Sequence, residues 1–145
     1  MNVEATATSV VSAMPAPTII ETIQLGSEWI SESAGGLSRY YSELVQELPK
    51  LGVGVRGLVV GSKRVATETG GAVHPFAPLG SSLPTRLAGV RASVRRAFAE
   101  CPDALFVSHF PLYAAPCLDL QRGRPLAVHF QGPCVKSGGW RNVSC

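Results

Sequence analysis

Residues 32–48 have the sequence ESAGGLSRYYSELVQEL, and the apolar segment VGVRGLVVG follows at residues 53–61. From Leu37 onward, apolar or aromatic side chains recur three and four positions apart, which is the spacing of one helical face. The predicted buried face consists of Leu37, Tyr40, Tyr41, Leu44, Val45, Leu48 and Leu51. The opposite arc is predicted to face solvent and carries Ser38, Arg39, Ser42, Glu43, Gln46, Glu47 and Lys50.

Proline and glycine mark the end of this helix. Pro49 lacks a backbone donor and disfavours helical geometry at Leu48, so the helix is expected to fray or kink there. Gly52 is expected to stop it. Residues 53–60 then predict a strand that is apolar on both faces, as in the interior of a parallel sheet.

A glycine pair, Gly35 and Gly36, opens the helix. Because glycine has no side chain, a ligand can approach the free amide groups at the helix start, where the helix dipole favours an anion. The pair is not the G-x-G-x-x-G motif of dinucleotide-binding proteins. A loop that simply needs unusual backbone angles is the alternative explanation.

The rest of the chain alternates predicted strands and helices. Strands are expected at residues 18–25, 72–77 (an edge strand, because it contains Pro75), 104–108 and 126–130, and helical segments at residues 83–99 and 112–120. This alternation predicts an α/β fold: an open, mainly parallel Rossmann-like sheet with helices on both faces. Residues 1–17 are predicted to be a flexible leader, and residues 134–145 an unpatterned tail that leaves the sheet incomplete at its C-terminal end.

Composition excludes several classes of protein. The net charge of +3 and the lack of an aromatic and basic platform argue against nucleic-acid binding. The apolar runs are too short to span a membrane, and no Lys or Arg precedes Arg39, so a cytoplasmic location is expected. The helix predicted at residues 83–99 has an apolar stripe of Leu87, Val90, Val94, Ala97 and Phe98. Its remaining circumference carries Arg86, Arg91, Arg95 and Arg96. A solvated surface is favoured there over weak contact with an anionic membrane.

The four cysteines show no C-x-x-C spacing. A zinc set of His109, Cys117, His129 and Cys134 would have gaps that match no familiar metal site. Neither a metal nor another cofactor is therefore expected.

His109 is the strongest candidate for a residue that acts on a ligand, because it directly follows the buried strand predicted at residues 104–108. Ligands of open α/β sheets bind at the carboxyl ends of the strands, where a histidine can orient or polarise a sugar hydroxyl or a phosphate. A histidine that only bonds a loop carbonyl is the alternative. His129, placed within the last predicted strand, is expected to be structural, either capping a loop or filling the sheet edge. The glycine pair, His109 and residues 129–133 are expected to converge at this edge.

Three segments together resemble a known family. They are SAGGLSRYYSELVQELPKLGV at residues 33–53, FVSHFPLYAAP at residues 106–116 and RGRPLAVHFQGP at residues 122–133. In this order they are similar to the N-terminal domain of family 4 glycosyltransferases, which are retaining enzymes of the GT-B type with two Rossmann-like domains. The resemblance covers about residues 18–133.

The resemblance implies transfer of a hexose from a nucleotide sugar to the hydroxyl of a sugar or glycolipid acceptor, with retention of configuration. In that family the N-terminal domain mainly holds the acceptor. The positions of Gly35 and Gly36 approach the donor phosphates, and the position of His109 lines the reaction centre and contacts the transferred sugar. These three residues are therefore the candidate substrate-binding residues, with His109 the candidate catalytic residue.

The chain departs from the family pattern after residue 133. The nucleotide-holding domain of that family, with its E-x7-E motif, does not follow. A truncated product is therefore expected, inactive alone unless another chain supplies the donor half. A non-catalytic Rossmann-like remnant and a phosphate-binding module are the alternatives.

Overall fold

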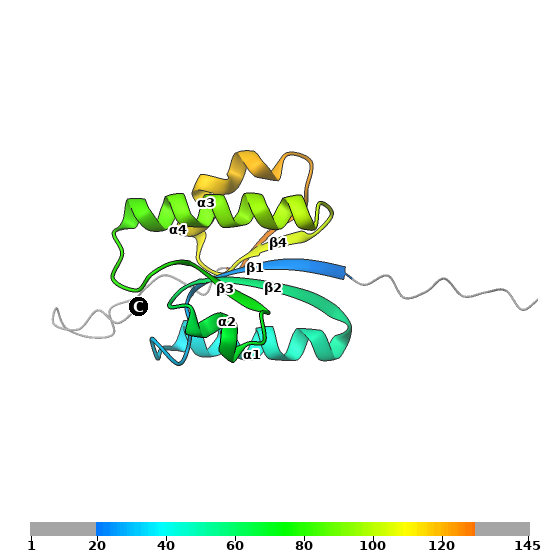
Figure 1. Cartoon of the computed structure of the whole chain (residues 1–145). Helices are drawn as coiled ribbons and strands as arrows, with labels where there is room; N and C mark the ends of the chain where they lie inside the picture. Colours follow the sequence, from blue (N-terminus) through cyan, green and yellow to red (C-terminus); the bar gives the residue numbers. More distant parts are fainter. Residues whose placement is uncertain (1–19, 130–145) are drawn as a thin grey trace, which may run out of the picture.

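The computed structural model describes residues 20–129. Its strands are β1 (Ile20–Glu28), β2 (Val53–Val60), β3 (Val73–Ala77), β4 (Leu105–Ser108) and β5 (Leu126–Val128). They pair in parallel in the order β3-β2-β1-β4-β5, with β1 at the centre. Helices α1 (Gly36–Glu47) and α2 (Arg64–Glu68) cover one face, and α3 (Leu83–Glu100) and α4 (Pro111–Ala114) cover the other (Figure 1). The predicted open, parallel α/β sheet is confirmed.

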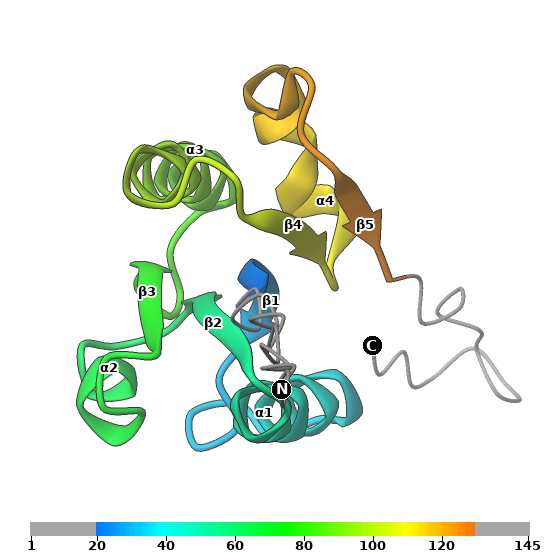
Figure 2. The same cartoon turned by 90° about the vertical axis from the view of Figure 1, so that its right-hand side faces the viewer.

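The strand order creates a switch point beside β1. The chain builds outward from β1 to β2 and β3, then crosses back through α3 to place β4 on the other side of β1. The helix that follows β1 and the helix that follows β4 therefore lie on opposite faces of the sheet (Figure 2). In sheets of this kind, ligands bind in the crevice that opens at the carboxyl ends of these two strands.

Two apolar clusters hold the layers together, because successive side chains of a strand point to opposite faces. The larger cluster lies between the sheet and α3, and includes Ile23, Leu25, Leu58, Phe106, Val90, Val94 and Phe98. The smaller cluster lies on the α1 and α2 side and consists of Trp29, Tyr41, Val45, Val59, Val65 and Val73. Full burial of one such side chain contributes about 1.5–3 kcal/mol.

The predicted end of α1 is confirmed, but its predicted orientation is partly wrong. The α-helix passes into a 3-10 turn at Leu48–Leu51, with Pro49 in its first positions and a left-handed Gly52 (φ 77°) after it. Ser38 and Ser42, predicted to be exposed, are buried, whereas Leu51 is exposed. The helix centres on the fully buried Tyr41, and the small serines on either side of it allow close contact with the sheet.

Other boundaries also differ from the prediction. Strand β1 runs to Glu28 rather than to residue 25, and the short helix α2 was not predicted within residues 62–82. Strand β5 ends at Val128, so His129 lies one residue beyond the strand rather than within it. All three residues of β5 are exposed although they are apolar, because β5 pairs with β4 alone at one edge of the described sheet.

The helix predicted at residues 83–99 is confirmed as α3, which uses the predicted apolar stripe of Val90, Val94, Ala97 and Phe98. It is followed, after β4 and α4, by a second 3-10 segment at Ala115–Gln121. Within residues 20–129, no helix is both long and apolar enough to cross a membrane.

Candidate functional site

The loop that leaves β1 is tied to the region around α2. The Glu32 carboxylate accepts a hydrogen bond from the Ser62 amide (2.8 Å). Trp29 Nε1 and the Ser31 hydroxyl both donate to Glu68 Oε2, at 3.2 and 2.8 Å. These bonds fix the path of the chain into the glycine pair.

Gly35 and Gly36 stand at the start of α1, with Gly35 as the extended N-cap residue (φ −168°, ψ 169°). Neither glycine has a positive φ, so unusual backbone angles do not explain the pair. No side chain caps this helix start, and its first turn carries no acidic residue. A Cβ on Gly36 would meet no atom within 4 Å. The open space and the uncapped amide groups leave room for an anionic group.

His109 lies where the sequence predicts, directly after β4. Its amide donates to the Leu25 carbonyl (2.8 Å), which joins it to the carboxyl end of β1. The side chain is only 3% exposed, and its Nε2 lies 2.8 Å from Gln24 Oε1. Burial, together with the nearby His129, lowers the pKa of His109 from 6.5 to about 4. The imidazole is therefore neutral at pH 7.

Tyr40 joins the start of α1 to both histidines. Its ring centroid lies 5.1 Å from that of His129, nearly stacked, and 5.8 Å from that of His109. The two imidazole centroids are 5.7 Å apart. The His129 amide donates to the Ser108 carbonyl (2.8 Å), so His129 extends the backbone pairing beyond β5. We refer to Gly35, Gly36, Tyr40, His109 and His129 as the carboxyl-edge site; residues 130–133, also predicted to reach it, lie outside the described residues.

Two residues that bear on this site were not singled out from the sequence. Thr22 and Gln24 lie on β1, and Gln24 Nε2 donates to Thr22 Oγ1 (3.0 Å), which donates to the Gly54 carbonyl (2.8 Å). Gln24 is also the partner of His109. The available signal was the alternation of polar and apolar residues in TIQL at residues 22–25, within a strand that the fold places at the sheet centre.

The residues considered as a zinc set do not form one where the structure describes them. In residues 20–129, no three His, Cys, Asp or Glu side chains are placed to hold a metal ion. Burial raises the pKa of the Cys117 thiol to about 11, which keeps the thiol protonated. Cys134 lies outside the described residues.

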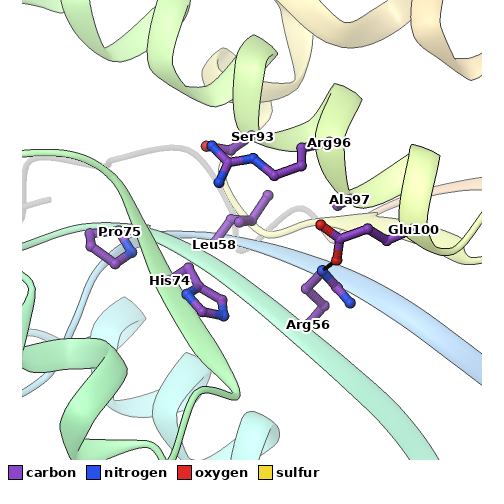
Figure 3. Close-up of a pocket in the computed structure, with 8 residues that line it drawn as sticks. All are labelled: Arg56, Leu58, His74, Pro75, Ser93, Arg96, Ala97 and Glu100. Atoms are coloured by element: carbon purple, nitrogen blue, oxygen red, sulfur yellow. Dashed lines mark hydrogen bonds and ion pairs between the residues drawn. The ribbon is translucent and has the colours of Figure 1, made fainter.

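A separate groove of about 270 Å³, which we call the α3 groove, lies between α3 and the strands β2 and β3 (Figure 3). Its lining contains none of the carboxyl-edge residues and consists of Arg56, Leu58, His74, Pro75, Ser93, Arg96, Ala97 and Glu100. Arg56 forms an ion pair with Glu100 within it. The carboxyl-edge site is therefore distinct from this groove and rests on strand order and on the side chains that meet there.

The model of one protein family, the glycosyl transferase 4-like domain, matches residues 35–143, which is more than half of the chain. The match begins at Gly35 and includes both histidines of the carboxyl-edge site. No curated protein and no solved structure matches the chain.

Proposed function

Because the chain belongs to the glycosyl transferase 4-like domain family, we propose that it forms the acceptor side of an enzyme that transfers a hexose from a nucleotide sugar to an acceptor hydroxyl, with retention of configuration. In this reaction the bond from the hexose C1 to the nucleotide diphosphate breaks and a bond from C1 to the acceptor oxygen forms. The acceptor proton leaves with the diphosphate. The observation that supports the proposal best is the meeting of His109, Tyr40 and His129 at the strand ends beside the switch point.

In this proposal His109 contacts a hydroxyl of the transferred hexose. A neutral imidazole can accept a hydrogen bond as well as donate one, whereas an imidazolium can only donate. The depressed pKa of His109 keeps the neutral form at pH 7. Its burial among aromatic rings also makes a polar contact stronger than the same contact in water.

Gly35 and Gly36 are proposed to receive the diphosphate of the donor. The amide groups of the first turn of α1 lack a side-chain cap and an acidic neighbour, both of which would compete with an anion. The donor nucleotide itself would be held by a second domain, so we propose that residues 20–129 do not catalyse the transfer alone.

A non-catalytic binding module is the second candidate. The burial of His109 favours it, because a side chain that is 3% exposed reaches a substrate only if the rings around it move. When a donor-binding polypeptide is present, the first candidate predicts hexose transfer and the second predicts none.

A transfer assay on the chain co-purified with its donor-binding polypeptide separates these candidates. We expect His109→Ala to lower the rate of hexose transfer about 100-fold or more, because positioned polar groups contribute on this scale. His74→Ala, a change of an exposed histidine in the α3 groove, is the matched control and should leave the rate unchanged. An unaltered rate in His109→Ala would remove this residue from the reaction centre.

A further inference from the structure

Thr22 and Gln24 are polar side chains in the central strand of the sheet. They are 4% and 3% exposed, and they project from β1 on the face that α1 covers. Buried polar groups are costly unless they are hydrogen-bonded. Both side chains are satisfied by one chain of hydrogen bonds that runs from the Gly54 carbonyl to the imidazole of His109.

This chain of bonds has a fixed direction. A carbonyl oxygen can only accept a hydrogen bond, so Thr22 donates its single hydroxyl proton to the Gly54 carbonyl (2.8 Å). Thr22 Oγ1 must then accept from Gln24, which turns the amide nitrogen of Gln24 toward it (3.0 Å). The amide oxygen of Gln24, which also only accepts, is left facing His109 Nε2 (2.8 Å). Nε2 of the neutral imidazole must therefore carry the proton.

The opposite nitrogen of the ring is left as an acceptor. His109 Nδ1 is buried and has no hydrogen-bond partner within residues 20–129. Building on the proposed function, we propose that Gln24 is a positioning residue, which holds His109 in the Nε2–H tautomer and thereby reserves Nδ1 to accept a hydrogen bond from a substrate hydroxyl.

The backbone around Gln24 is also held in place. The Tyr41 hydroxyl donates to the Gln24 carbonyl (2.6 Å) and accepts from the Leu58 amide (3.1 Å). At the other end, the His109 amide bonds the Leu25 carbonyl. Because both partners are fixed to the same strand, the distance between Gln24 and the imidazole is set by the sheet rather than by a loop.

The test is a long-range ¹H–¹⁵N spectrum of the chain labelled at histidine nitrogens, recorded at pH 7.5. We expect His109 to show a protonated Nε2 and a bare Nδ1. Thr22→Val has nearly the same shape but removes the anchoring hydroxyl, so the Gln24 amide can turn over and the two tautomers should become mixed. Thr22→Ser retains a hydroxyl and should behave as the wild type. A bare Nε2 in the wild type, or one tautomer preserved in a folded Thr22→Val chain, overturns the proposal.

The transfer assay supplies a second readout and separates this proposal from the proposed function. Thr22→Val and Gln24→Leu should each lower kcat about 10- to 100-fold with little change in KM, because the reacting groups lose their alignment. Thr22→Ser should recover the rate. If His109→Ala abolishes transfer while Thr22→Val changes neither tautomer nor kcat, the positioning role fails and the proposed function remains. If His109→Ala leaves transfer unchanged, the proposed function itself fails.

Discussion

Tyr41 shows at the scale of one residue how α1 is attached to the sheet. Its hydroxyl bonds the backbone of both β1 and β2, and burial raises its pKa far above the ordinary value for tyrosine. Replacement by phenylalanine would leave a buried carbonyl and a buried amide without this partner. We expect Tyr41→Phe to lower the free energy of unfolding by about 1–3 kcal/mol in urea titrations. The neighbouring Tyr40→Phe, at a half-buried position, is the control and should change it little.

His109 gives the fold a defined dependence on pH. Because its pKa is lowered from 6.5 to about 4 by burial, the unfolded chain binds this proton more readily than the folded chain. The stability that depends on His109 should be complete above pH 6.5 and should be lost as the pH falls from 6.5 toward 4, by up to about 3 kcal/mol.

The measurement that checks this is urea unfolding at pH 7 and pH 5, with the wild type compared against His109→Gln. The loss of stability on acidification should be smaller in His109→Gln, whereas His74→Gln should follow the wild type. Equal losses in all three chains would show that His109 does not carry the effect.

At the scale of elements, Gly89 sets how closely α3 approaches β3. A Cβ at this position would lie 2.2 Å from the carbonyl oxygen of Phe76, which is a backbone atom and cannot easily give way. Gly89→Ala should therefore destabilise the fold by about 1–3 kcal/mol, even though alanine favours the helix itself. Gly36→Ala, which has open space at the start of α1, should be neutral or slightly stabilising. Thermal melts of the two variants compare them directly.

The arginines of α3 are partly engaged within the fold. Arg86 contacts Glu28 and the Tyr113 hydroxyl, and Arg91 pairs with Asp119, whose pKa it lowers to about 2. The apolar stripe of the helix is used against the sheet. We expect no flotation with anionic liposomes at physiological salt, because two of the four arginines are already paired and the apolar stripe of α3 faces the sheet. Salt-resistant flotation would contradict this.

The spacing of apolar residues predicted most of these elements but not how α1 is rotated about its axis. The apolar spacing of α3 and the strand at residues 53–60 matched the structure, since burial dictates both patterns. The rotation of α1 could not be predicted, because it depends on the bonds between Tyr41 and two strands that are distant in sequence. Gln24 was missed for the same reason: its partner His109 lies 85 residues away.

At the scale of the whole molecule, the parallel order β3-β2-β1-β4-β5 brings the distant parts of the site together. The sequence predicted that Gly35, Gly36 and His109 would follow strand ends, because strands and helices alternate. The adjacency of β1 and β4 is a property of the sheet, and it places His109 beside the carboxyl end of β1. Tyr40 then joins α1 to both histidines.

The most direct test of the carboxyl-edge site is a ¹H–¹⁵N titration of the labelled chain with UDP-glucose and, separately, with GDP-mannose. If the chain supplies the acceptor side of the enzyme, as proposed, it should bind the nucleotide sugar weakly, and the shifted amides should be those of Gly35, Gly36, Tyr40, His109 and His129. Shifts confined to the α3 groove around Arg56 and Arg96, or micromolar binding of the nucleotide sugar by this chain alone, would contradict the account.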